Sequence, residues 1–216
     1  MMYNFPDPKN APKHSPIAYG GDLSSQALLE AYKKGIFPWF MDGQEILWWS
    51  PDPRAVLYPK DVRVQKSIKP FFKRYKVKFD SDFTGLINLC KNARNEPTWI
   101  SDKIIAAYTN LHNLGFAHSV EVYENDELVG GLYGLILGKI FCGESMISIK
   151  ANASKVALIA LCKALDKFDF IIDAQVMNPH LKFMGALNLN RDEFLNILDM
   201  KKDKFCGFYK FSELVS

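Results

Sequence analysis

The order of elements in the second half of the chain constrains the fold most, because apolar strand-like segments there alternate with helical ones. The predicted order is strand, strand, helix, strand, helix, helix, strand. In that order the segments are 118–123, 128–142 with an interruption at Gly138, 154–167, 170–176, 179–184, a helix that Asn190 can cap, and 205–211. Residues 124–127 form the turn between the first two strands. This order implies a mixed sheet with helices on its faces, and so an α+β fold.

The first half begins with an irregular segment that is rich in proline and glycine. Within it, Ser24 can cap a helix that runs to Lys34 and stops at Gly35. Further predicted elements are a strand at 55–58, a basic helix at 64–75, a strand at 76–79 and a helix from Ser101 to Gly115. We therefore predict a small N-terminal domain, 1–54, and a second domain, 55–216. The order of elements in the second domain resembles the acyltransferase fold of the GCN5-related N-acetyltransferases.

Bulk composition narrows the class of protein. Hydrophobic residues make up 48% of the 216, which suits a globular chain with a real core. Residues 1–10 hold no apolar run typical of a secretory signal, and no stretch approaches the roughly 18 apolar residues of a membrane span. We therefore expect a cytoplasmic protein that does not bind membranes. The four cysteines form no CxxC pair, and His112 and His118 lack close metal-ligand spacing. Reduced thiols and no metal site are expected.

The segment Ile171-Ile172-Asp173-Ala174-Gln175-Val176 carries the first candidate site. Side chains alternate between the two faces of a strand. Asp173 and Gln175 should therefore point one way, and Ala174 the other way, into the core. An acid and an amide would then lie side by side on an otherwise apolar strand. The alternative is a strand end whose polar residues meet solvent or a loop.

Glu144, in the segment Phe141-Cys142-Gly143-Glu144-Ser145, is the second candidate. It falls where an apolar strand is expected to end at a glycine. A carboxylate in such a place often has a raised pKa, and it can act in proton transfer or orient an amine. The alternative is a surface or capping glutamate.

The four tryptophans form a third candidate set: Trp39, Trp48, Trp49 and Trp99. Their rings can stack on unpaired bases. They can also fill the junction between the two domains, and we expect that role for at least one of Trp48 and Trp49.

The fourth candidate is the basic segment 60–78. It holds eight Lys or Arg residues against one Asp, a net charge of +7, whereas the rest of the chain is slightly acidic. On the predicted helix, Lys66, Lys69 and Lys73 share one face. A solvated face is the usual meaning of such a run, but the concentration of charge favours contact with a phosphate backbone.

One motif is missing. A coenzyme A acetyltransferase of this fold has a glycine-rich turn before its central helix, but residues 149–155 here contain no glycine. The chain also has no G-x-x-x-x-G-K-[ST] loop and no G-x-S-x-G elbow. Two alternatives stay open. A coenzyme A-dependent N-acetyltransferase would bind coenzyme A in a calorimeter, and a non-catalytic RNA-binding module would leave the Asp173/Gln175 pair without a purpose.

Nine segments closely resemble the bacterial leucyl/phenylalanyl-tRNA–protein transferases, in matching order and spacing across nearly the whole chain. They are YGGDLS (19–24), GIFPWF (35–40), ILWWSPDPR (46–54), TWI (98–100), HSVEV (118–122), LVGGLYG (128–134), FCGESM (141–146), NASK (152–155) and DAQV (173–176). The resemblance implies transfer of Leu or Phe, and less well Met, from aminoacyl-tRNA to acceptor proteins that begin with Arg or Lys. The product would be marked for degradation by the N-end rule. The aminoacyl ester is already activated, so we expect no cofactor, and we expect a monomer.

The resemblance also assigns roles to residues. The 3′-terminal adenosine would stack on Trp39 and Trp99, and the amino-acid side chain would enter an apolar pocket. The residues assigned to that pocket are Leu132, Phe141, Ile172 and, beside Glu144, Ser145. Asp173 and Gln175 match the family's catalytic Asp and Gln, and Glu144 matches its acidic pocket residue. The tRNA would lie on Lys66, Lys69, Lys73 and Arg74.

The predicted reaction begins when the acceptor amine attacks the ester carbonyl. We expect Asp173 to accept the proton, directly or through Gln175 or a water, while Gln175 orients the ester or donates to the oxyanion. Two positions depart from the family's pattern. Ala174 stands where the family usually has Cys, and Lys150 places a positive charge one residue away from the family's usual Arg.

Overall fold

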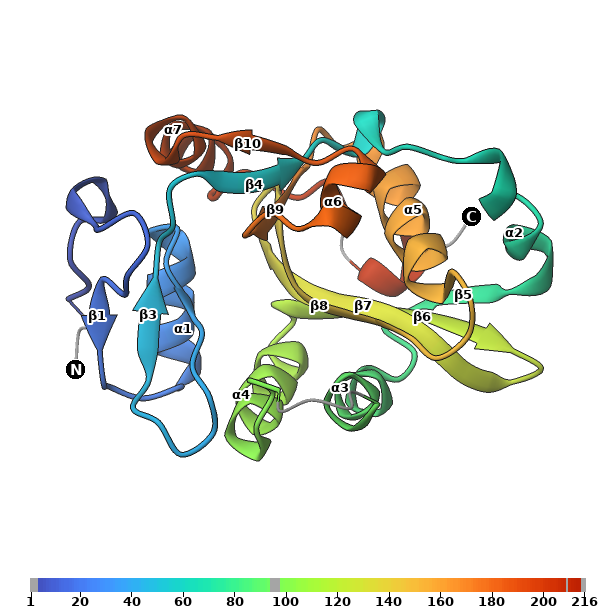
Figure 1. The fold of residues 1–216 in the computed structure, drawn as a ribbon, viewed down its shortest axis with the longest axis horizontal. Coiled ribbons are helices and arrows are strands. Elements are labelled where there is room, and N and C mark those ends of the chain that lie inside the picture. Colours follow the sequence, from blue (N-terminus) through green and yellow to red (C-terminus); the bar gives the residue numbers. More distant parts are fainter. Residues whose placement is uncertain (1–3, 94–97, 209, 215–216) are drawn as a thin grey trace.

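The computed structural model describes residues 4–93, 98–208 and 210–214, and it sets a three-stranded sheet beside a seven-stranded one (Figure 1). The small sheet has the order β1-β3-β2, and the large sheet has the order β10-β4-β9-β8-β7-β6-β5. The strands are β1 (Ala18–Tyr19), β2 (Phe37–Pro38), β3 (Leu47–Trp49), β4 (Arg54–Leu57), β5 (Lys76–Phe79), β6 (Ala117–Glu124), β7 (Glu127–Leu137), β8 (Ile140–Ser148), β9 (Ile171–Gln175) and β10 (Leu187–Leu189). The predicted mixed sheet with a small N-terminal part is confirmed.

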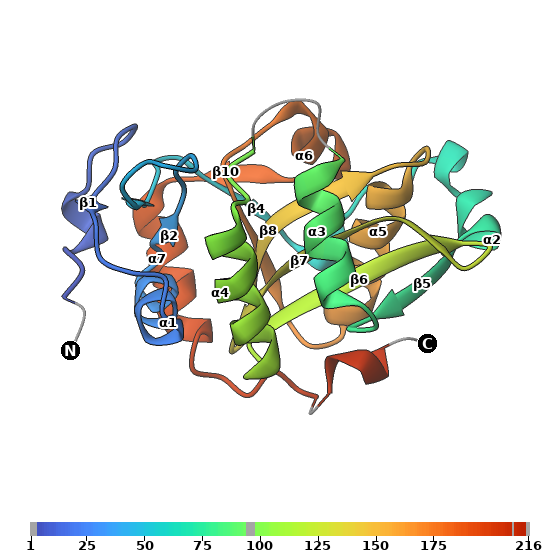
Figure 2. The same cartoon turned by 90° about the horizontal axis from the view of Figure 1, so that it is seen from below.

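Helices cover both faces of the large sheet (Figures 1 and 2). The α-helices of the described residues are α1 (Ser25–Lys33), α2 (Phe71–Arg74), α3 (Phe83–Asn92), α4 (Asp102–Asn113), α5 (Ala153–Asp166), α6 (Pro179–Met184) and α7 (Arg191–Lys201). Helix α5 packs on one face with one apolar cluster, whereas α3 and α4 pack on the other face with a second cluster. Because α5 connects β8 to β9, these two strands run parallel, while the other paired strands of the sheet run antiparallel.

The N-terminal part shares its core with the rest of the chain. Tyr32 and Trp48 belong to the same buried cluster as Tyr108 of α4 and Phe194 of α7. Gly35 ends α1 with a φ of +72°, and a Cβ there would lie 2.8 Å from a methyl carbon of Leu195, so the turn both requires the left-handed conformation and allows α7 to approach closely. Helix α7 therefore packs closely against the N-terminal part and joins it to the rest of the core.

Local capping signals in the sequence predict the helix starts well. The side chains of Ser24, Ser101 and Asn190 accept backbone N–H groups at the first turns of α1, α4 and α7. Glu193 completes a capping box with Asn190. These predicted helix starts are confirmed.

The predicted basic helix at 64–75 is wrong. Residues Lys66–Ile68 form a 3-10 turn and Phe71–Arg74 form the four-residue α2, with Pro70 between them. Proline has no N–H to donate to the carbonyl four residues earlier, so a continuous helix cannot form there. As a result Lys66, Lys69 and Lys73 do not share one helical face.

Two further predictions need correction, and one helix is additional to those predicted. Gly138 turns the chain, so the segment 128–142 is two antiparallel strands, and β8 continues past Gly143 to Ser148. The predicted strand at 205–211 is wrong, because residues 205–208 and 210 are irregular and Phe211–Leu214 form a 3-10 helix. Helix α3 was not predicted.

Candidate active site

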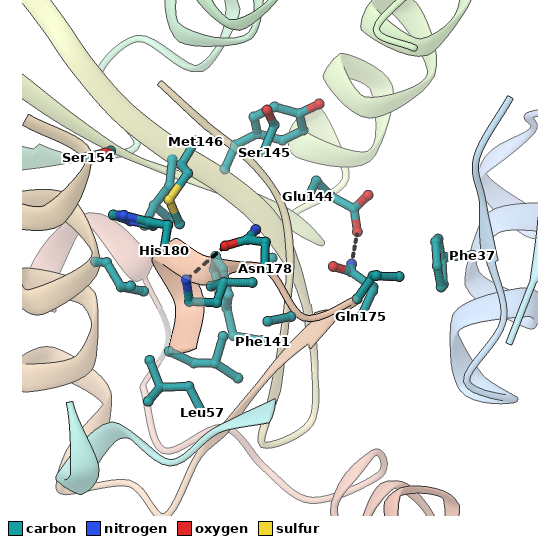
Figure 3. Close-up of a pocket in the computed structure, with 18 of the residues that line it drawn as sticks. Phe37, Leu57, Phe141, Glu144, Ser145, Met146, Ser154, Gln175, Asn178 and His180 are labelled. Atoms are coloured by element: carbon teal, nitrogen blue, oxygen red, sulfur yellow. Dashed lines mark hydrogen bonds between the residues drawn. The ribbon is translucent and has the colours of Figure 1, made fainter. Parts of the chain in front are cut away.

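A pocket opens where β8 and β9 separate. The two strands pair only at Ile140–Ile171, Phe141–Ile172 and Cys142–Asp173, and then they diverge. A cavity of about 760 Å³ lies beyond the last pair (Figure 3). The residues predicted for the site that line it are Trp39, Trp99, Leu132, Phe141, Glu144, Ser145, Ile172 and Gln175. Segments that lie far apart in the sequence therefore meet at one place.

Each of the two strands carries a β-bulge at the pocket. Glu144 is the extra residue in β8, because Gly143 pairs with Gly134 and Ser145 with the adjacent Tyr133. Ala174 is the extra residue in β9, between the partners of Val56 and Ala55. A bulge redirects side chains locally, and in β8 the alternation breaks, because Cys142 and Met146 pack against opposite apolar clusters.

Glu144 lies at the centre of a hydrogen-bonded group. Tyr32 Oη donates to its Oε1 at 2.7 Å, Tyr108 Oη to its Oε2 at 3.1 Å, and Gln175 Nε2 to its Oε1 at 3.2 Å. Tyr32 comes from α1 and Tyr108 from α4, so the N-terminal part contributes to the site. Figure 3 shows the amide of Gln175 beside the carboxylate.

The partners of Glu144 do not neutralise its charge. Burial raises its pKa to about 7, although the hydrogen bonds from Tyr32 and Tyr108 act to lower it. Burial also raises the pKa of both tyrosines, and the nearby Glu144 raises it further, so their hydroxyls keep their protons. The raised pKa agrees with that expected for Glu144, although the residue lies within β8 and not at a strand end. Glu144 can change protonation state near neutral pH.

Asp173 lies behind the pocket wall and does not line the cavity. Arg54 Nε and Nη2 donate to its two carboxylate oxygens, each at 2.7 Å, and both side chains are 1% exposed. Arg54 Nη1 also donates to the carbonyl of Gly35 at 3.1 Å. Its guanidinium carbon lies 4.9 Å and 4.6 Å from the ring centres of Phe37 and Phe194.

Gln175 has a φ of +54°, a left-handed conformation that costs about 1–2 kcal/mol for a residue with a side chain. Its backbone N–H donates to Asp173 Oδ1 at 3.1 Å. Asp173 reaches Arg54 and Gln175 reaches Glu144, both on the side of the apolar cluster of α3 and α4, whereas Ile172 and Ala174 pack against the cluster of α5. This agrees with the predicted alternation, although only Gln175 of the pair lines the pocket. Ala174 is half-buried and packs against the apolar cluster of α5, as its predicted orientation requires, and it also lines the pocket.

The pocket beyond Glu144 is mainly apolar. Leu132, Phe141 and Ile172 form its walls and are almost fully buried. His180 of α6 lies on the far side from Glu144 (Figure 3), and among the described residues its Nε2 has no hydrogen-bond partner. Burial lowers the pKa of His180, and nearby Lys155 lowers it further, so its ring is neutral at physiological pH.

The tryptophans divide into two kinds. Trp39, which is 44% exposed, and the half-buried Trp99 line the pocket. The ring of Trp49 lies 5.6 Å from that of Trp39. Trp48 is buried, packs edge-on against Phe5 and donates to the carbonyl of Gly20. Trp48 also belongs to the apolar cluster that the N-terminal part shares with the rest of the chain, and its role at the junction stays a prediction.

The basic residues lie away from the pocket. Lys66, Lys69 and Lys73 are exposed, and Arg74 binds Glu124. Lys150 Nζ lies 3.0 Å from Glu124 and 2.7 Å from Glu127, so this displaced charge already has partners. The hydrogen bonds from Arg74 and Lys150 lower the pKa of Glu124 to about 2.

Sequence reasoning gave no role to Arg54, Tyr32, Tyr108 or His180. Arg54 offered a signal: it is a lone charge at the start of the apolar strand 54–57, and a buried cation needs a counter-ion. Tyr32 and Tyr108 sit on the buried faces of their helices and read as ordinary core residues. Nothing in the local pattern points to Glu144 as their shared partner.

The site combines features that an acyl transfer to an amine would use. Its apolar walls suit an uncharged side chain, its aromatic mouth offers stacking faces, and Glu144 can exchange a proton near neutral pH. Within the described residues, no three His, Cys, Asp or Glu side chains gather as metal ligands would, and no helix is long and apolar enough to cross a membrane.

Comparison with known proteins narrows the class. The sequence model described as leucyl/phenylalanyl-tRNA protein transferase matches residues 56–199, and the model of that family's N-terminal domain matches residues 21–52. The chain belongs to the leucyl/phenylalanyl-tRNA–protein transferase family. The predicted family, and with it the predicted class of aminoacyltransferase, is confirmed.

Relatives with this name cover almost the full length. One from Campylobacter jejuni subsp. doylei is 51% identical, over 96% of this chain and 95% of its own. Those from Vibrio atlanticus and Shigella dysenteriae are 48% and 47% identical, each over 92% of this chain and 87% of their own. A solved structure of a conserved protein of unknown function from Bacteroides thetaiotaomicron shares 12% identity with a TM-score of 0.46, over 61% of this chain and 53% of that one.

Proposed function

We propose that this chain transfers leucine or phenylalanine, and methionine less well, from aminoacyl-tRNA to the N-terminal Arg or Lys of acceptor proteins. The transfer marks those proteins for degradation by the N-end rule. The observation that carries the proposal is the titratable Glu144 at an apolar pocket with an aromatic mouth. We further propose that the enzyme works in the cytoplasm as a monomer, and that its two domains are 1–54 and 55–216.

The aminoacyl end of the tRNA fits the two parts of the pocket. The terminal adenosine stacks on Trp39 and Trp99, which offer aromatic faces at the mouth. The amino-acid side chain enters between Leu132, Phe141 and Ile172. An apolar wall discriminates by size and polarity, and one methylene is worth about 1–3 kcal/mol. Ser145 lies beside Glu144 and contacts the bound aminoacyl group.

Glu144 is the proton acceptor in our proposal. The acceptor's neutral α-amino nitrogen attacks the ester carbonyl, a C–N bond forms, and the bond from that carbon to the ribose oxygen breaks. Glu144 takes the proton that the nitrogen loses and returns it to the leaving ribose oxygen, so the carboxylate is regenerated. Gln175 donates to Glu144 through Nε2, which leaves its carbonyl oxygen to orient the amine.

Asp173 has a different part. Both of its oxygens bind Arg54, and Oδ1 also accepts the N–H of Gln175. Taking up a proton would leave the buried Arg54 without its counter-ion, which is costly. We therefore assign Asp173 to holding Gln175 in place and not to receiving the proton.

The rest of the tRNA is proposed to lie on the exposed Lys66, Lys69 and Lys73, with Arg74 beside them. The contact is to phosphates, so it carries little sequence preference. The loss of the common helical face spreads these charges over two short turns. It does not remove them from the surface.

A relationship to the GCN5-related acetyltransferase fold is supported by the parallel pair of β8 and β9, which separates at the pocket. Coenzyme A as acyl carrier is not supported. At the start of α5 the N–H of Ser154 donates to Ser148 Oγ at 2.8 Å, so a group that would hold pyrophosphate is already occupied. An activated ester on RNA suits the aromatic mouth better.

The test is incubation with tRNA that carries labelled leucine and with a protein that begins with Arg. A matched protein that begins with Ala serves as the control. Label should enter only the first protein. Label in neither protein, together with heat released on titration of coenzyme A in a calorimeter, would replace our proposal with an acetyltransferase.

A further inference from the structure

We propose that Arg54 is a positioning residue: through Asp173 it fixes Gln175 beside Glu144, and through Gly35 and Phe37 it makes this placement depend on the N-terminal part. The inference rests on the proposed function, since it names a further residue of the same site. Arg54 is the last residue before the boundary proposed between the two domains, and it is the first residue of β4.

The chain of contacts runs without a gap. Arg54 holds both oxygens of Asp173 at 2.7 Å, and Asp173 Oδ1 accepts the N–H of Gln175 at 3.1 Å. Gln175 Nε2 then reaches Glu144 Oε1 at 3.2 Å. The bidentate grip fixes the plane of the carboxylate. The plane of the carboxylate sets the position of Oδ1, which accepts the N–H of Gln175. This hydrogen bond stabilises the left-handed conformation of Gln175.

Three contacts fix Arg54 in turn. Its Nη1 binds the carbonyl of Gly35, and its guanidinium lies between the rings of Phe37 and Phe194. Gly35 and Phe37 belong to the N-terminal part, and Phe194 belongs to α7. The N-terminal part also supplies Tyr32, which donates to Glu144. It therefore contacts both Arg54 and Glu144. Through these contacts, the guanidinium of Arg54 touches the small sheet at Phe37, α7 at Phe194 and β9 at Asp173.

The test uses the full-length enzyme and three variants. Arg54→Met combined with Asp173→Asn removes both buried charges with little change in volume, so the protein should fold. Arg54→Lys keeps the charge but cannot form the bidentate fork. Arg191→Met is the matched control, because Arg191 is also buried but binds only the carbonyls of Ala11, Pro12 and Ser50 through its side chain.

Turnover and KM are measured separately. The double variant should lower kcat by about 100-fold while the KM for leucyl-tRNA changes less than about twofold, since positioning acts on the reacting groups and not on stacking. Arg54→Lys should lose about tenfold in kcat. Arg191→Met should lower Tm and leave kcat unchanged. A crystal structure of the double variant should show the Gln175 amide displaced from Glu144.

A folded double variant with normal kcat and an unmoved Gln175 would overturn the inference and leave Arg54 a buried structural charge. If the double variant does not fold, Arg54→Lys decides the question, because full kcat in that variant also contradicts positioning by the fork. Absence of transfer by the unmodified enzyme would overturn the proposed function alone. The placement of Gln175 in the variant crystal would still decide the role of Arg54.

Discussion

The two carboxylates of the site occupy regions of opposite character. Behind the pocket wall, Asp173 meets the fixed positive charge of Arg54 and is sealed from solvent. At the pocket, Glu144 meets two hydroxyls and an amide, which orient it without cancelling its charge. Burial therefore raises the pKa of Glu144 to about 7, into the range where a carboxylate can exchange protons at neutral pH. The groups that contact each carboxylate, more than the residue type, decide which one has a structural role and which one can act as a base.

The largest expected effect is on the rate. Glu144→Gln keeps the size and can keep the tyrosine hydrogen bonds, but it removes the base, so transfer at saturating leucyl-tRNA should fall by about 10²–10⁴-fold. Glu45→Gln, which changes an exposed glutamate of the N-terminal part, is the matched control and should be silent. Near-normal transfer by Glu144→Gln would show that the enzyme works by holding ester and amine together.

Stability should change in opposite directions at the two carboxylates. Asp173→Asn leaves Arg54 buried without its counter-ion, and loss of a buried pair costs about 3–5 kcal/mol, or roughly 6–20 °C in Tm. Glu144 behaves otherwise because its folded pKa lies above the unfolded value of 4.5. The folded state then binds the proton more tightly, so its stability falls as pH rises from about 4.5 to about 7. Glu144→Gln should therefore raise Tm at pH 8 and change it little at pH 4. Melting curves at both pH values check the prediction, and a lower Tm for Glu144→Gln at pH 8 would contradict it.

The exposed basic segment offers a second contrast with the buried site. Replacing Lys66, Lys69 and Lys73 together by Ala should weaken leucyl-tRNA binding by about tenfold and reduce the slope of log affinity against log salt by about 2–3. The kcat at saturation should not change. Filter binding at several salt concentrations measures the effect, with a minimal aminoacyl-adenosine substrate as control. Unchanged tRNA affinity would make the segment a solvated face.

The smallest expected effect is at Tyr32. Tyr32→Phe removes one hydrogen bond to Glu144, worth about 1 kcal/mol, so kcat should fall by about fivefold. Because that hydrogen bond lowers the pKa of Glu144, its loss should move the limb of the pH profile upward. A downward move would contradict the assigned partners.

The sequence predicts those features of the molecule that depend on neighbouring residues. Ser24, Ser101 and Asn190 begin helices as their capping chemistry predicts. The family resemblance, and not the local pattern, places Leu132 and Phe141 at the pocket. The basic segment 64–75 does not form one helix because Pro70 interrupts it, and this signal is present in the sequence.

The remaining features depend on contacts across long distances in the sequence. Arg54 and Asp173 lie 119 residues apart, and nothing local pairs them. The bulges at Glu144 and Ala174 arise from the register between strands. Alternation gives the face on which Asp173 and Gln175 lie, but it does not show that Arg54 binds Asp173 and that only Gln175 of the pair lines the pocket.

The central claim is that Glu144 receives the proton. The most direct test is the pH dependence of transfer at saturating leucyl-tRNA, measured with two acceptors whose α-amino groups differ in pKa. We predict a rising limb near pH 7 that keeps its position with both acceptors and disappears in Glu144→Gln. A limb that follows the acceptor's own pKa, and that persists in Glu144→Gln, would contradict the assignment of Glu144 as the base.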